Sequence, residues 1–194
     1  MSAQNFLSGA PYKKDEYQGG RTNFGMYLRD ISVSEPFQSG SIKAVLVVSD
    51  KDSDAGISFE KVKSQIKLVP EFAVPDQERI AVRKKGSPHI IVLMIPMVGT
   101  GNLESLCLQS AYERWDFKAH LDTFVDNTPA KDWSNDKQAK ARMQAILATT
   151  NKKQPDTGFA SHWNAKEEYR IPLNHECFSD LVAFLNGFEA LVAD

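Results

Sequence analysis

Two long apolar segments constrain the fold of this chain more than any other feature. They are IKAVLVVSD (residues 42–50) and HIIVLMIPMV (residues 89–98), both rich in β-branched residues and neither alternating between apolar and polar positions. Alternation would indicate a strand with one solvated face, so these continuous runs predict strands buried on both faces. Strands of this kind are typical of parallel sheets that are covered by helices.

Amphipathic helices are predicted before, between and after these strands. Apolar residues recur at helical spacing, and Thr22, Asn102 and Asn135 stand where N-caps are expected. Ile57 and Leu185 are among the residues expected to face the core. The alternation of strands and helices predicts an α/β fold with a mostly parallel central sheet and helices on both faces. The predicted helices cover residues 22–31, 57–69, 103 onward, 135–150 and 176–192.

The length of 194 residues predicts a single domain spanning 1–194. The first 18 residues are polar and unpatterned, and we expect them to be partly mobile. The stretch 70–88 is less regular and is expected to hold one or two short strands and a turn at Gly86. The start of the chain lacks the features of a signal peptide and no segment reaches the ~18 apolar residues of a membrane span, which predicts a cytoplasmic protein.

The net charge of −2 provides no global positive field that would attract nucleic acid. Basic residues cluster in RIAVRKKG (79–86) and at Lys137, Lys140 and Arg142, and we interpret both clusters as solvated faces.

The three tryptophans are expected to be packing residues rather than base-stacking platforms. The two cysteines lie in apolar helical patterns and are expected to be reduced core thiols. The four histidines show no metal-ligand spacing.

Three alternating aspartates, Asp50, Asp52 and Asp54, follow the first strand directly in VVSDKDSDAG. Three carboxylates this close repel one another, and a hard, oxygen-seeking cation such as Mg²⁺ or Mn²⁺ relieves the repulsion. The simpler alternative is a solvated turn, because Asp favours turns in any case. A calcium loop fits poorly, because its sixth and twelfth positions would be Ala55 and Lys61. An aspartyl-phosphate phosphatase with Asp50 as nucleophile also fits poorly, because Ser53-Asp54 replaces the expected small hydroxylated turn.

The second strand ends in GTGNLE, a glycine turn that opens a helix. A dinucleotide-binding fingerprint would carry a third glycine at position 104, where this chain has a glutamate that would face the pyrophosphate. Glu104 has two possible roles. It is either a first-turn residue whose negative charge is stabilised by the helix dipole, or a carboxylate aimed at the acidic turn. Ligand sites of open α/β sheets lie beyond the carboxyl ends of the strands. If the two strands are parallel neighbours, both turns emerge at one edge.

Five segments of the chain form a recognisable succession. They are GG-x-x-NF (19–24), VLVVSDKDSD (45–54), IVLMIPMVGTGNLESLCLQS (91–110), SNDKQAKARMQAIL (134–147) and IPLNHECFSDLVAFLNGF (171–188). Together they resemble a bacterial Toprim-like family of unknown function, similar to the Toprim half of the overcoming-lysogenization-defect (OLD) nucleases, with genes that often lie beside ATPase genes. The resemblance covers roughly residues 15–190. It implies a Toprim fold in which Asp50, Asp52 and Asp54 ligate Mg²⁺ or Mn²⁺ and Glu104 is an additional, catalytic acid.

One departure from the Toprim pattern divides the functional expectations. Toprim domains begin with a strand that ends in a glutamate, and here Glu16 is the only glutamate ahead of Gly19-Gly20, on a segment that does not read as a buried strand. The resemblance therefore implies one of two functions. The first is a magnesium-dependent nuclease (a phosphodiesterase and hydrolase) that acts with a partner ATPase. The second is a non-catalytic Toprim-like module that binds an ATPase or nucleic acid.

Overall fold

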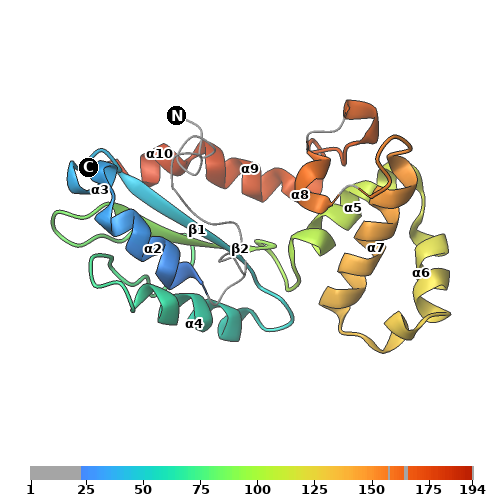
Figure 1. Cartoon of the computed structure of the whole chain (residues 1–194), viewed down its shortest axis with the longest axis horizontal. Coiled ribbons are helices and arrows are strands. Elements are labelled where there is room, and N and C mark those ends of the chain that lie inside the picture. The colour runs from blue at the N-terminus through green and yellow to red at the C-terminus, as the bar shows by residue number, and fades with distance from the viewer. Residues whose placement is uncertain (1–22, 157, 164–165, 194) are drawn as a thin grey trace.

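Two parallel strands run through the middle of the molecule (Figure 1). The computed structural model describes residues 23–156, 158–163 and 166–193. β1 (Ala44–Asp50) pairs with β2 (His89–Ile95) in a register that places Ala44 opposite His89 and Asp50 opposite Ile95. Within the described residues these two strands are the whole sheet. The parallel pairing predicted from the two apolar runs is confirmed, and the second strand stops before Pro96, which cannot donate to a ladder.

Helices cover both faces of this sheet, which confirms the α/β class. Two of the helices, α2 and α4, lie below the strands in Figure 1 and share an apolar cluster with one face of β2. A second cluster joins the other face of β2 to α5, α7 and α9. The longer helices are α2 (Phe24–Val33), α4 (Ala55–Ile66), α5 (Leu103–Trp115), α6 (Lys118–Asp126), α7 (Asn135–Thr150) and α9 (Ser179–Asn186). The shorter elements are α3 (Glu35–Gln38), η2 (Pro129–Asp132), α8 (Phe159–His162), η3 (Glu167–Tyr169), η4 (Glu176–Phe178) and α10 (Phe188–Leu191).

β2 is the fully buried strand. Successive side chains of a strand point to opposite faces, so Ile90, Val92 and Met94 enter the cluster with α2 and α4, while Leu93 and Ile95 enter the cluster with α5 and α7. Burying an aliphatic side chain of this size contributes about 1.5–3 kcal/mol. β2 therefore connects the two halves of the core, as its unbroken apolar sequence predicted.

β1 differs from the prediction, because it is not buried on both faces. Val47 is buried, but Val48, which points to the opposite face, is 43% exposed. The reason is topological, since β1 has β2 on one side only within the described part of the chain. Beyond β2, Val82 makes a single antiparallel bridge to Ile90, and the Arg79 N–H donates to the Val92 carbonyl over 2.8 Å.

The stretch 70–88 forms this one bridge in place of the one or two predicted strands. The predicted turn at Gly86 is confirmed, and Gly86 has a φ of +83°, which only glycine adopts without strain. Val69 and Phe72, which precede this stretch or begin it, are buried against the α2–α4 side. A few apolar anchors and one bridge therefore hold this segment without a regular ladder.

Two details of the predicted helices are wrong. α4 begins at Ala55 and buries Ser58, Val62 and Ile66, spaced four apart, so Ile57 falls on the outer side and is 56% exposed. α7 covers the predicted residues, but its N-cap is Ser134, one residue before Asn135, and the Ser134 side chain makes no capping bond. The backbone of Ser134 is extended, which marks it as the last residue before the helix.

The predicted C-terminal helix is broken into three pieces, η4, α9 and α10. Gly187 separates the last two, consistent with the low helix propensity of glycine. Phe178 is buried as predicted, and Leu181, Phe184 and Phe188 are partly buried. Leu185 is 49% exposed, so the prediction that it faces the core is wrong.

Some sequence predictions fall on residues that the structure does not describe. These are Thr22 as an N-cap, Glu16, Gly19-Gly20 and the polar first 18 residues. In the described part of the chain, no helix is both long enough and apolar enough to cross a membrane.

Both cysteines are free, as predicted, and their environments differ. Burial, with smaller contributions from the nearby Cys177 and Glu104, raises the pKa of the Cys107 thiol to about 12. Because the thiolate is the reactive form, roughly one Cys107 side chain in ten thousand is reactive at pH 8.

Iodoacetamide at pH 8 is expected to leave Cys107 unmodified in the native protein and to modify both cysteines in urea, as measured by peptide mass spectrometry. Rapid native labelling of Cys107 would contradict this environment.

Candidate functional site

The parallel register brings the acidic turn and the glycine turn to the same edge of the sheet. Asp50, the last residue of β1, lies opposite Ile95, the last residue of β2. Two residues further, Asp52 forms an antiparallel bridge with Gly101, whose N–H donates to the Asp52 carbonyl over 2.7 Å. The prediction that both turns emerge side by side, at the carboxyl ends of parallel strands, is confirmed.

Asp50 is tied directly to the second turn. Its Oδ1 accepts a hydrogen bond of 2.9 Å from the backbone N–H of Leu103, the first residue of α5. The first N–H groups of a helix have no partner within the helix and carry the positive end of its dipole. The Asp50 carboxylate satisfies one of them, so its position is fixed relative to both strands and to α5. Its second oxygen, Oδ2, makes no hydrogen bond to any residue in the described part of the chain.

The other two aspartates of the turn have different surroundings. Asp52 is partly buried and has a positive φ of 49°, so the backbone bends sharply between β1 and α4. Asp54 is exposed and is the N-cap of α4, where its Oδ1 accepts a 2.9 Å hydrogen bond from the Ile57 N–H. An N-cap is the role that a turn aspartate plays without any metal. The structure thus gives Asp54 a local function that the sequence interpretation had not assigned.

The glycine turn is built so that α5 can start close to the acidic turn. Gly101 has a φ of +127°, and a Cβ there would lie 2.4 Å from Ser105 Oγ, so this position requires glycine. Asn102 is fully buried and forms a capping box with Ser105, as the predicted N-cap. The Asn102 Nδ2 also donates to the Asp136 carbonyl over 3.1 Å, which links the first turn of α7 to this edge.

Glu104 is half-buried in the first turn of α5, as predicted. It follows the residue whose N–H binds Asp50, so it lies near the same helix end. Among the residues that the structure describes, no group of three or more His, Cys, Asp or Glu side chains is arranged to hold a metal ion. Asp50, Asp52, Asp54 and Glu104 therefore share an edge without forming a closed ligand cage.

Lys51 is a residue of this edge that the sequence analysis missed. It is 7% exposed, and its Nζ donates to the Met97 carbonyl over 3.0 Å and lies 3.5 Å from Glu78 Oε2. It thus links the acidic turn to the loop after β2 and compensates part of the negative charge. A lysine between two aspartates looks exposed in sequence, and nothing in the local pattern indicates its burial.

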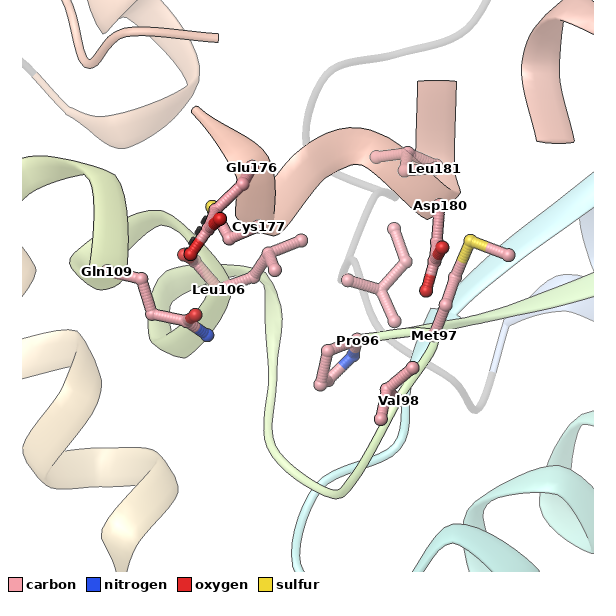
Figure 2. Close-up of a pocket in the computed structure, with 10 residues that line it drawn as sticks. Pro96, Met97, Val98, Leu106, Gln109, Glu176, Cys177, Asp180 and Leu181 are labelled. Carbon is pink, nitrogen blue, oxygen red and sulfur yellow. Dashed lines mark hydrogen bonds between the residues drawn. The ribbon is translucent and has the colours of Figure 1, made fainter. Parts of the chain in front are cut away.

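A hollow of about 310 Å³ lies beyond the end of β2, between the loop that follows it and the C-terminal segment (Figure 2). Cys177 Sγ donates to the Leu106 carbonyl over 3.6 Å at this hollow, and burial raises its pKa, so it is a protonated thiol rather than a nucleophile. None of the three aspartates lines the hollow, which separates it from the acidic turn. It is lined by Ile95, Pro96, Met97, Val98, Leu106, Gln109, Glu176, Cys177, Asp180 and Leu181.

Comparison with known proteins identifies the family. The family model described as "Protein of unknown function (DUF3226)" matches residues 16–189. The chain belongs to the DUF3226 family. No curated protein and no solved structure shows significant similarity to it. In this DUF3226 member, the matched region includes both strands, the acidic turn and α5, so the candidate site lies within the family region.

The capping role of Asp54 gives a test that separates stability from metal binding. Asp54→Ala is expected to lower the free energy of unfolding by about 1 kcal/mol, because α4 loses its N-cap. Asp54→Ser is expected to retain most of the stability, since serine is also a good N-cap. Urea unfolding followed by circular dichroism measures both.

Glu71→Ala, which removes an exposed acid outside any helix, is the matched control and is expected to leave stability unchanged. Equal stability of Asp54→Ala and the unmodified chain would contradict the capping role. Manganese titration of Asp54→Ser then reports on ligation alone, because this variant keeps the cap but lacks the carboxylate.

Proposed function

We propose that this protein is a Toprim-like, divalent-metal-binding protein that acts on phosphodiesters, with Asp50 as the principal ligand of Mg²⁺ or Mn²⁺. The observation that carries the proposal is the position of Asp50. It stands at the carboxyl end of β1, opposite the end of β2, and its Oδ1 is held by the N–H of Leu103. Sites of open α/β sheets lie in this position.

The donor set fits a hard cation with an incomplete protein shell. Mg²⁺ usually keeps several waters and takes one or two protein carboxylates, completing its shell with phosphate oxygens. Asp50 supplies one such carboxylate, and the adjoining Asp52 and Asp54 supply the other acids of the turn. Within the described residues, the edge has no closed cage of three acids. Such an open edge suits an ion that is shared with a phosphate substrate.

Three residues of the edge, Asp50, Lys51 and Glu104, would then have a role in phosphodiester hydrolysis. When bound, the ion supplies positive charge that polarises the phosphate and lowers the pKa of a water molecule. Asp50 positions the ion, and Lys51, held by Met97 and Glu78, keeps the turn in place. Glu104, at the start of α5, orients the attacking water and accepts its proton as the phosphorus–oxygen bond to the leaving group breaks. The resemblance to OLD-type Toprim segments supports these assignments.

A second candidate function is a non-catalytic module that binds a partner ATPase. Val182 and Leu185 lie three residues apart on α9 and are 47% and 49% exposed, and Leu191 of α10 is 40% exposed. Residues three apart lie on the same face of a helix. Apolar side chains gathered on one face are typical of protein interaction sites, so the C-terminal helices are the surface that would contact the ATPase.

The metal site is tested with Asp50→Asn. The asparagine Oδ1 still accepts the Leu103 N–H, so the fold is expected to be unchanged, while the charge that attracts the cation is lost. Manganese affinity measured by calorimetry is expected to fall at least about tenfold. Asp126→Asn, an exposed acid at the end of α6, is the matched control and should bind manganese like the unmodified chain. Unchanged affinity in Asp50→Asn would refute the site.

Catalysis is tested by nicking of supercoiled plasmid in manganese. The isolated chain is expected to nick slowly, because the acids of the edge form no closed ligand cage within the described residues and would hold the ion weakly. Asp50→Asn and Glu104→Gln are each expected to reduce the rate by about 100-fold, the usual contribution of an acid–base group. Nicking that persists in both variants would contradict the phosphodiesterase proposal. Manganese binding without any nicking would favour the ATPase-binding module instead.

A further inference from the structure

One of the three tryptophans is exposed rather than packed in the core, and its surroundings suggest a second binding surface. Trp115 and Trp163 pack against the core cluster, as predicted, but Trp133 is 48% exposed. It stands at the rim of an open hollow of about 650 Å³ on the outer side of α7. We call this feature the α7 hollow. It is lined by Trp133, Lys137, Lys140, Ala141 and Gln144.

The backbone that carries Trp133 is held from both sides. The Trp133 N–H donates to the Ala130 carbonyl over 3.1 Å, and Ala130 is buried. The Trp133 carbonyl accepts from Gln138 Nε2 over 3.1 Å, and the same Nε2 donates to the Lys131 carbonyl. An exposed indole on a fixed backbone loses little conformational entropy when a flat ligand stacks on it.

The basic cluster predicted from the sequence divides into two parts in the structure. Arg142 is half-buried, and its guanidinium binds Asp122 over 3.1 Å and Gln138 over 3.0 Å, so its charge is already compensated. Lys137 and Lys140 are exposed and form no ion pair with any residue in the described ranges. Residues three apart on a helix have Cβ atoms ~5–6 Å apart. The two lysines are therefore neighbours on α7, and both line the hollow together with Trp133, while no acid lines it.

We propose that the α7 hollow binds single-stranded nucleic acid, with one base stacked on Trp133 and neighbouring phosphates held by Lys137 and Lys140. Aromatic platforms beside a basic groove are the means by which proteins bind single strands without sequence preference. A duplex hides its base faces, so an exposed indole on a surface hollow favours unpaired bases. An acidic peptide offers carboxylates to the lysines but no flat face to the indole.

A chain of hydrogen bonds links the start of α7 to the acidic edge. Asp50 binds the Leu103 N–H, and the neighbouring Asn102 donates to the carbonyl of Asp136, the residue before Lys137. The inference deepens the proposed function and rests on it for the choice of substrate polymer.

The test measures binding of a fluorescein-labelled oligothymidine of about ten nucleotides by anisotropy, in EDTA and low salt. Trp133→Ala is expected to weaken binding about tenfold, and Trp133→Phe to restore most of the affinity. The double variant Lys137→Gln/Lys140→Gln is expected to weaken binding and to reduce the slope of log K against log salt by about 1.4, since each phosphate contact on a single strand contributes ~0.7.

Matched controls remove equivalent groups elsewhere. Phe124→Ala removes an aromatic ring of equal exposure on α6, and Lys152→Gln/Lys153→Gln removes two exposed charges just after α7. Both controls are expected to retain the affinity and the salt slope of the unmodified chain. Circular dichroism confirms the fold of every variant.

Three results would overturn the inference. They are no oligothymidine binding by the unmodified chain, equal weakening by the control variants, and competition by polyglutamate with the same dependence on Trp133. Because the assay contains EDTA, it measures oligothymidine binding without any contribution from a metal ion. If the unmodified chain binds the oligonucleotide but not manganese, only the metal site is refuted. If it binds manganese but not the oligonucleotide, only the α7 hollow is refuted.

Discussion

The parallel pairing of β1 with β2 is the constraint on which the rest of the structure depends. β2 contributes its alternate side chains to two separate apolar clusters, so the helices on both faces are joined through this one strand. The same pairing fixes the register that places Asp50 opposite Ile95 and sets the acidic turn beside the start of α5. Core and candidate site therefore share one cause, and a shift of register would disrupt both.

The acidic turn is stable because its charges are distributed among different partners. The Asp50 carboxylate faces the positive end of α5, and Asp54 caps α4. Lys51, buried between them, binds the Met97 carbonyl and pairs with Glu78. These contacts offset part of the repulsion among the three acids of the turn.

Much of the candidate edge could be predicted from the sequence, and the limits are physical. The apolar runs and the terminal Asp50 and Gly101 are local signals, and they indicated the shared edge correctly. The burial of Lys51 depends on Glu78 and Met97, which lie far away in the chain. The exposure of Trp133 depends on which parts of the fold reach its ring, and the local sequence does not indicate that. The Toprim resemblance and the metal-ligand roles of Asp50, Asp52, Asp54 and Glu104 remain proposals.

The sequence by itself determined the α/β class, the two parallel strands and the capping of α5 by Asn102, because periodicity, β-branched content and cap chemistry act over a few residues. Tertiary structure alone decided that β1 is the exposed strand of the pair, with Val48 43% exposed, while β2 is buried on both faces. It also decided that Arg142 turns toward Asp122 while Lys137 and Lys140 stay beside Trp133. Both strands come from continuous apolar segments, so only the contacts made in the folded protein decide which of them is buried. The three cations all lie on α7, so only their partners in the fold distinguish Arg142 from the two lysines.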